Sequence, residues 1–325
     1  MTTLIVGAGL VGAQVARILV ERGERPVLMD SAAQPQALGE IFDLGKAELI
    51  AGDILRPLTI AAALKAYGVT KIVHTAANPM LTLGAQRDPF AAIQLNIMGT
   101  VNVIEAARAF GVKRVVVSSS NVLNHFLAGG DGSNDEMKES GFPRPSTFYS
   151  ATKQTIESLG LNYARWCGME FAAMRYGAVF GPWGGAGGGG PSNVMRSAVQ
   201  AALDGGESVL PAGAMEWVYS KDAGLGTVKA LDAKTLGDPA KGEGVFNITM
   251  GSLSTPDATA KALQAAVPGA KVRIETPAAA AVALPDMKRV SDLSRAKAVL
   301  GFTPQYDLVA GIRDLAAWLK GRKRG

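Results

Sequence analysis

The amino-acid sequence predicts an α/β protein whose core is a doubly wound parallel sheet. Short β-branched runs alternate with helical patterns through the first half of the chain, and such alternation places helices on both faces of a parallel sheet. A glycine-rich turn joins the first predicted strand to the first predicted helix. In addition, 48% of the 325 residues are hydrophobic and 19% are charged, so the chain can bury a large core and lacks the composition of a disordered protein.

The elements of this sheet follow one another in order along the chain. Strands are predicted from β-branched runs and helices from apolar residues at helical spacing, and one helix stops at Gly111. The predicted strands are residues 3–6, 26–30, 71–75, 114–118 and 245–249, and the predicted helices are residues 11–22 and 98–110. The order strand, helix, strand indicates crossover connections between parallel strands.

We expect two interleaved regions. Residues 1–180 form the sheet domain, and residues 181–325 form a smaller region from which residues 215–250 partly return to the sheet. The segment GGAGGGG at 184–190, closed by Pro191, has no side chains able to hold one conformation, so we predict a flexible loop. It serves either as a linker or as a mobile lid.

Charge, hydropathy and cysteine content exclude several classes of protein. The net charge of +5 derives in part from a basic C-terminal helix end at 320–324, which we interpret as solvated and not as a nucleic-acid site. No uninterrupted apolar run reaches the roughly 18 residues of a membrane span, and the apolar N-terminus lacks the basic leader of a signal peptide. The single Cys167 cannot form an internal disulfide, which favours a cytoplasmic protein.

The turn GAGLVG at residues 7–12 has the GxGxxG spacing of a Rossmann dinucleotide site. Its glycines allow a tight turn, close approach of a pyrophosphate and close helix packing, while the helix N-terminus attracts the phosphates. Asp30 ends the next predicted strand, where a carboxylate accepts from the ribose hydroxyl and repels a 2′-phosphate. We therefore predict bound NAD, contacted by Gly7, Gly9, Leu10, Val11, Gly12 and Asp30.

Tyr149 and Lys153 have the YxxxK spacing, which puts both side chains on one face of a helix. A phenol is a poor base at neutral pH, but a nearby ammonium favours its ionised form. Three serines at 118–120 end a predicted strand, and the carboxyl ends of parallel strands are where such sheets bind ligands. A serine hydroxyl there could polarise a substrate carbonyl.

At this point the chain resembles the extended short-chain dehydrogenases, the NAD-dependent epimerase/dehydratase family, over nearly its whole length. Further motifs follow the order of the family: GDIL at 52–55, VHTAAN at 73–78, NIMGT at 96–100, RYGAVFGP at 175–182, EWVYSKD at 216–222, FNI at 246–248 and RVSD at 289–292. So many ordered matches are hard to obtain by chance.

The resemblance implies a role for each matching residue. Tyr149 would be the acid/base, Lys153 would lower its pKa and hold the nicotinamide ribose, and Ser120 would be the catalytic serine, with Ser119 as the alternative. Further cofactor contacts would come from Asp53, Ile54, Ala76, Ala77, Lys153 and Tyr176, and substrate contacts from Ser119, Asn193 and Arg289.

The chain departs from the family pattern at three places. Val6 stands where the extended family usually begins its three-glycine pattern, a change we expect to be tolerated. Met215 stands where nucleotide-sugar enzymes carry an arginine that pairs with the diphosphate, which argues against a nucleotide-sugar substrate. Asn121 and Val122 follow Ser120 where the dehydratase branch has an acidic pair, which argues against elimination of water.

The two histidines are interpreted differently. His74 is expected to pack in the core, whereas His125 is a candidate pocket residue, and neither has partners at metal-ligand spacing. We expect reversible hydride transfer between a C–OH of a sugar-like substrate and NAD, with epimerisation favoured over net dehydrogenation. A non-catalytic NAD-binding sensor is the second alternative. A homodimer is implied by the resemblance alone.

Overall fold

A computed structural model describes residues 1–77, 88–126, 139, 145, 147–275 and 289–322. Its central feature is a seven-stranded sheet with the order β10-β6-β5-β4-β1-β2-β3, in which every neighbouring pair is parallel. These strands are β1 (Thr2–Val6), β2 (Val27–Asp30), β3 (Glu48–Ala51), β4 (Val69–His74), β5 (Arg114–Ser120), β6 (Glu170–Tyr176) and β10 (Val245–Ile248). The predicted doubly wound α/β fold is confirmed.

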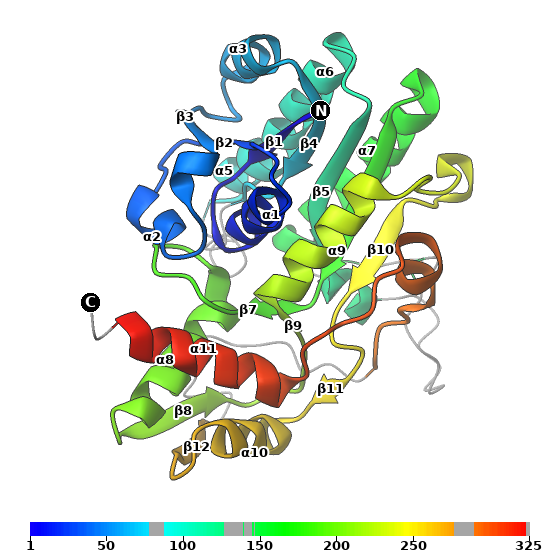
Figure 1. The fold of residues 1–325 in the computed structure, drawn as a ribbon. Coiled ribbons are helices and arrows are strands. Elements are labelled where there is room, and N and C mark those ends of the chain that lie inside the picture. Colours follow the sequence, from blue (N-terminus) through cyan, green and yellow to red (C-terminus); the bar gives the residue numbers. More distant parts are fainter. Residues whose placement is uncertain (78–87, 127–138, 140–144, 146, 276–288, 323–325) are drawn as a thin grey trace.

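Helices cover both faces of this sheet (Figure 1). On one face, α1 (Leu10–Glu21) and α9 (Ser220–Asp232) bury residues such as Val15 and Val228 in one apolar cluster with β1 and β6. On the other face, α3 (Pro57–Tyr67), α6 (Gly99–Ala109) and α7 (Phe148–Cys167) bury Ile60, Ile104 and Ile156 in a second cluster. The sheet is therefore apolar on both sides, as the continuous hydrophobic strands of a parallel sheet require.

A smaller layer lies beside the sheet, towards the carboxyl ends of its strands (Figure 1). It contains two small sheets, β11-β9-β7 and β12-β8, and the helices α8, α10 and α11. Phe180 and Trp217 pack edge to face in its core, with ring centroids 5.6 Å apart. The bounds are β7 (Ala178–Phe180), α8 (Gly189–Leu203), β8 (Glu207–Pro211), β9 (Met215–Tyr219), β11 (Leu253–Ser254), α10 (Pro256–Ala266), β12 (Lys271–Glu275) and α11 (Leu308–Arg322).

Short helical segments complete the described chain. These are α2 (Pro35–Gly39), η1 (Leu44–Lys46), α5 (Pro89–Ile93), η2 (Gln94–Met98), η3 (Asn121–Phe126), η4 (Pro239–Lys241) and η5 (Ala296–Leu300). The segments α5, η2 and α6 run on as one helix. This helix, Pro89–Ala109, is the one described helix long and apolar enough to span a membrane, and 44% of its most apolar window is buried inside the protein.

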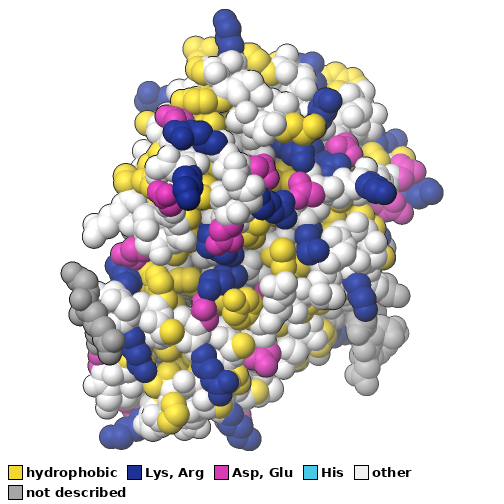
Figure 2. Space-filling model, in the orientation of Figure 1, with side chains coloured by type: hydrophobic (Ala, Val, Ile, Leu, Met, Phe, Trp, Pro, Cys, Tyr) yellow, Lys and Arg dark blue, Asp and Glu magenta, His cyan; other side chains and the backbone are white. Residues whose placement is uncertain are grey.

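The surface carries charges of both signs. Figure 2 shows lysines and arginines interspersed with aspartates and glutamates over the face it presents. At the described end of α11, Arg322 pairs with Glu40 of the loop after α2, at 3.0 Å between Nε and Oε2. Arg322, one residue of the basic C-terminal stretch, thus holds α11 against the sheet domain.

The buried His74 makes fold stability depend on pH. Its side chain is 3% exposed, and burial together with the nearby Lys153 charge lowers its pKa to about 3. The unfolded imidazole takes up a proton near pH 6.5, so the unfolded state binds more protons between pH 6.5 and 3. As the pH falls through this range, we expect this group to lower the free energy of unfolding by at most about 1.4 kcal/mol per pH unit.

Urea unfolding of the wild type and of His74→Gln at a series of pH values between 6.5 and 5 tests this expectation. The variant should lose less stability than the wild type as the pH falls, because glutamine does not titrate. Parallel curves for the two proteins would contradict the assignment of this slope to His74.

Candidate active site

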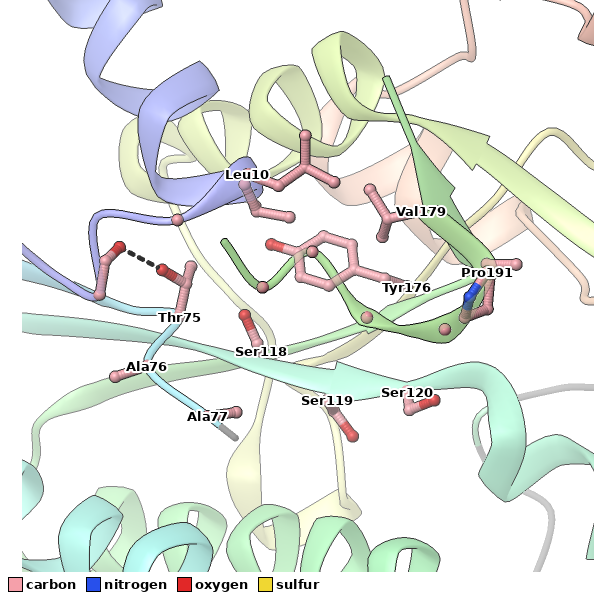
Figure 3. A pocket seen from close by; sticks show the side chains of 18 of the residues that line it. Leu10, Thr75, Ala76, Ala77, Ser118, Ser119, Ser120, Tyr176, Val179 and Pro191 are labelled. Carbon is pink, nitrogen blue, oxygen red and sulfur yellow. Dashed lines mark hydrogen bonds between the residues drawn. The ribbon is translucent and has the colours of Figure 1, made fainter. Parts of the chain in front are cut away.

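A cavity of about 630 Å³ opens at the carboxyl ends of β1, β4, β5 and β6. Its walls come from segments far apart in the sequence: the glycine turn, the ends of these strands, the start of α7, and the segment before α8. Figure 3 shows Leu10 and Val179 on one side of the Tyr176 ring, with Ser118 near the other side. The cavity therefore lies where α/β sheets bind ligands.

The glycine turn is shaped by contacts that no side chain would allow. Gly7 has a φ of +98°, and a Cβ there would lie 2.4 Å from the backbone nitrogen of Ala76, while one at Gly12 would lie 2.1 Å from the Gly7 carbonyl oxygen. The Thr75 hydroxyl donates to that same carbonyl at 2.8 Å (Figure 3). Gly9, at the uncapped N-terminus of α1, faces open space. This turn fits a dinucleotide pyrophosphate.

Asp30 lines the cavity at the end of β2 and is held in place by the turn itself. One carboxylate oxygen accepts from the Ala8 amide and the other from the Ala32 amide, each at 2.8 Å. Each oxygen keeps a further lone pair for a hydroxyl. The carboxylate therefore lies ready for ribose hydroxyls and disfavours a phosphate.

Tyr149 and Lys153 project from the first turns of α7, whose start is fixed by a capping box of Thr147 and Ser150. The Lys153 ammonium donates to the Ser118 carbonyl at 2.8 Å and lies 5.6 Å from the centre of the Tyr149 ring. The Ser120 hydroxyl lies near the Tyr149 phenol and acts on its pKa as a hydrogen-bonding neighbour. The structure thus brings together the three groups for which the sequence predicted chemistry.

Ser119 has different partners. Its hydroxyl donates at 2.5 Å to Glu157, which also forms a buried ion pair with Arg175 at 2.8 Å. Sequence reasoning missed this pair, although Glu157 follows Lys153 by one helical turn and so lies on the same face of α7. Of the two serines considered, Ser120 is the one that meets Tyr149.

Burial dominates the titration of both catalytic candidates. It raises the pKa of Tyr149, and the bond from Ser120 opposes that rise. It lowers the pKa of Lys153 to about 8, against the charge of Glu157. The sequence led us to expect that the lysine would depress the pKa of the tyrosine, but in the protein alone the loss of hydration outweighs any such effect.

The segment at 184–190 is more ordered than we expected. The Gln34 carboxamide accepts from the Ala186 amide at 2.5 Å and donates to the Ala186 carbonyl at 3.3 Å, and the Trp183 indole donates to the same carbonyl. Helix α8 already begins at Gly189. Side chains outside the segment hold it, which its own composition could not reveal. Gln34 and Ala186 both line the cavity, and we call this contact the clasp.

The other predicted site residues divide into two groups. Leu10, Val11, Ala76, Ala77 and Tyr176 line the cavity. Four do not lie among its lining residues: Asp53 accepts from the Leu55 amide, Ile54 packs against Gly99, Asn193 accepts from Arg196, and Arg289 is half-buried. The His125 side chain lies outside the described residues. Within the described part of the chain, no group of three metal-ligating side chains occurs.

Comparison with known proteins identifies the family. The model of the NAD dependent epimerase/dehydratase family matches residues 3–249, which is most of the chain. The chain belongs to this family. The resemblance inferred from the motifs is confirmed, and NAD, the cofactor predicted from the glycine turn and Asp30, is the cofactor of the family.

The relatives of this epimerase/dehydratase-family protein carry the names of different activities. Sterol demethylase protein B of Methylococcus capsulatus is 31% identical over 73% of this chain and 68% of its own length. UDP-glucuronate 4-epimerase 1 of Arabidopsis thaliana is 24% identical over 98% of this chain and 76% of its own length. With UDP-glucuronic acid decarboxylase 1 of the same plant, the match is 28% identical and spans only 39% of that relative.

Solved structures share the fold. UDP-glucose 4-epimerase of Thermus thermophilus, in complex with NAD, has a TM-score of 0.79 at 22% identity, with 99% of each chain covered. A partial-consensus L-threonine 3-dehydrogenase has a TM-score of 0.81 at 24% identity, covering 99% of this chain and 100% of that one. One fold thus carries several activities among these neighbours.

The clasp predicts slow release of the cofactor. Replacing Gln34 by alanine removes the two hydrogen bonds that join the start of α2 to Ala186 across the cavity. Each such bond contributes about 0.5–1.5 kcal/mol to stability. We expect Gln34→Ala to raise the dissociation rate of NAD about tenfold, measured by stopped-flow displacement. Gln36→Ala, which changes an exposed residue of α2 two positions after Gln34, should release NAD as the wild type does. Equal rates for Gln34→Ala and the wild type would show that the clasp does not hold the cofactor.

Proposed function

We propose that this protein catalyses reversible, NAD-dependent hydride transfer at a C–OH group of a sugar or sugar-nucleotide-like substrate, with net epimerisation favoured. One observation carries the proposal: Tyr149, Ser120 and Lys153 converge on a cavity that continues to the glycine turn. The family of the chain supports it. UDP-glucuronate 4-epimerases among the relatives support the epimerase over the alternatives.

Each side chain has one task in this proposal. When bound, NAD supplies the hydride acceptor and donor. Tyr149, in its ionised phenolate form, takes the proton of the substrate hydroxyl and so becomes the neutral phenol, and Ser120 donates a hydrogen bond to the oxygen as it becomes a carbonyl. Lys153, fixed on the Ser118 carbonyl, places a positive charge beside the phenol and stabilises its ionised form during the proton transfer.

Cofactor contacts follow from the residues that meet the cavity. The amides at the start of α1 would hold the pyrophosphate, and Asp30 would hold the adenosine ribose. Lys153 would reach the nicotinamide ribose, and Tyr176 would form part of the wall at that end. Asp53, Ile54, Asn193 and Arg289, although implied by the resemblance, are weaker candidates because they do not line this cavity.

Two alternatives use the same fold. Net dehydrogenation of a non-nucleotide sugar, a sugar acid or another hydroxy compound is favoured by Met215, which stands in the cavity wall without a charge to pair with a diphosphate. Among the described lining residues, only Asp30 and Lys153 carry charge, and both already have tasks. A non-catalytic NAD sensor would leave the assembled Tyr149, Ser120 and Lys153 without a purpose.

Tyr149→Phe provides the direct test of the chemistry. Removing the hydroxyl that carries the proton should lower kcat by about 100-fold or more, measured with NAD and UDP-glucuronic acid, UDP-glucose and free sugars as candidate substrates. Tyr163→Phe, on the outer part of the same helix, should keep the wild-type rate. Undiminished turnover in Tyr149→Phe would reject this mechanism.

The absorbance of NADH separates the two enzymatic outcomes in the same assay. An epimerase re-reduces its keto intermediate and returns the cofactor to NAD, so no NADH accumulates. NADH that accumulates in proportion to substrate consumed would favour the dehydrogenase and exclude the epimerase.

We further propose that the protein is a cytoplasmic homodimer. Large apolar side chains are exposed on α5, η2 and α7: Phe90 is 70% and Trp166 is 69% exposed, and Ile93, Met98 and Phe148 are exposed as well. Such a concentration of apolar surface is typical of an interface between subunits. A second copy of the same helices offers the matching surface in a two-fold dimer.

Sedimentation velocity tests the dimer. The wild type should sediment as a species of twice 33.7 kDa, and Phe90→Asp should shift it towards the monomer. Leu58→Asp, a change at an apolar residue of α3 that is 84% exposed, should leave the dimer intact. A monomeric wild type at micromolar concentration would reject the proposal.

A further inference from the structure

Glu216 is a fully buried carboxylate directly behind the cavity. It is the second residue of β9 and is 0% exposed. Its neighbour Met215 lines the cavity, and so does Gly177, whose absent Cβ would lie 2.6 Å from the Glu216 carbonyl oxygen. Both the backbone and the side chain of Glu216 are therefore part of the support of the cavity wall.

The carboxylate accepts hydrogen bonds from three separate segments. Asn121, just after β5, donates its side-chain amide at 3.3 Å, and Thr249, just after β10, donates its hydroxyl at 2.7 Å. The Ser291 hydroxyl donates to one carboxylate oxygen at 2.6 Å, and its backbone amide donates to both oxygens, each at 3.2 Å. Glu216 thus joins chain segments that are 33 to 95 residues away in the sequence.

Burying a carboxylate in this way costs free energy, and stable folding does not need a carboxylate at this position. Burial raises the pKa of Glu216, and the bonds from Ser291, Thr249 and Asn121 only partly oppose this. An apolar side chain of similar volume in such a position is often as stabilising as a buried charge, so a carboxylate here suggests a need for defined geometry. The groups that this carboxylate positions lie near the proposed chemistry.

Two of its partners lead directly to the proposed chemistry. Asn121 follows Ser120, the hydroxyl that meets Tyr149, so the Asn121 bond restrains the end of β5 that carries the serine. Ser291 lies two residues after Arg289, a candidate substrate contact. The carboxylate therefore ties the end of β5, which carries the serine, to the segment that follows Arg289.

We propose that Glu216 is a positioning residue for hydride transfer, which fixes the Ser120 end of β5 relative to the Ser291 segment and the Met215 wall. The inference rests on the proposed function for its effect on rate. Glu216 touches no reacting atom and acts through Asn121 and Ser120. A small displacement of a catalytic group lowers a rate steeply, so loss of this anchor should reduce kcat far more than cofactor binding.

Glu216→Gln is the test, made in the full-length protein with NAD present. Glutamine keeps the size of the side chain but replaces one acceptor oxygen by an NH₂ group, and each of the two oxygens accepts from at least two donors, so the NH₂ group meets donors at either position. We expect kcat to fall about 100-fold, while the dissociation constant of NAD stays within about twofold of the wild type. Wild-type kcat in a folded Glu216→Gln would overturn the proposal, and so would an equal weakening of NAD binding.

Asp222→Asn is the matched control for the loss of a buried carboxylate. Asp222, on α9, is also buried and accepts from the backbone amides of Gln305 and Tyr306, away from the cavity. The Asp222→Asn variant should lower the midpoint of thermal unfolding as Glu216→Gln does, but its kcat should stay within about twofold of the wild type. A similar loss of kcat in both variants would show that Glu216 contributes only stability.

Hydrogen exchange gives a reading that does not depend on a substrate. In Glu216→Gln with NAD bound, amides of residues 118–123 and 289–293 should exchange faster, and amides of β1 and α1 should not. If no candidate substrate turns over, this measurement still tests whether Glu216 anchors these two segments. Should Glu216→Gln not fold, Glu216→Asp keeps the charge and moves it back by one methylene, and it should show the same two segments loosened. Unchanged exchange in those segments would reject the proposal.

Discussion

The contact between the Lys153 ammonium and the Ser118 carbonyl fixes the geometry on which the rest of the site depends. A buried ammonium that loses its hydration needs a partner, and the strand-end carbonyl supplies one at 2.8 Å. This contact sets helix α7 in one position along β5. The capping box of Thr147 and Ser150 starts the helix at a defined residue, so Tyr149 is carried to Ser120 with little remaining freedom.

A buried ion pair between Glu157 and Arg175 supports the same junction of α7 with β5. The register of the parallel strands places Ser119 opposite Arg175, and both side chains reach Glu157 on α7. With its two charges almost fully buried, the pair is stable only if its hydrogen bonds are complete. Glu157 also raises the pKa of Lys153 against the effect of burial. The ion pair of Glu157 and Arg175 thus helps to keep Lys153 charged.

Local sequence predicted those parts of the structure that short segments specify. The glycine turn, Asp30 and the Tyr149–Lys153 pair each lie within a few residues of a predicted strand end or helix start, and the sheet follows from the alternation of elements. Glu216, Gln34 and Glu157 could not be found in this way. Their partners are 18 to 152 residues away, and a single carboxylate or amide in a sequence has no pattern.

The same difference explains why the cofactor could be predicted and the substrate could not. The predicted pyrophosphate and ribose contacts come from one turn and one strand end, where spacing constrains the residue types. The remaining wall is assembled from Val122, Val179, Pro191 and Met215, which lie on four separate segments. Each could change without altering any local pattern. Specificity therefore depends on the tertiary arrangement of those segments. The buried carboxylate of Glu216, next to Met215, binds side chains that follow β5 and β10 and so helps to hold this part of the wall.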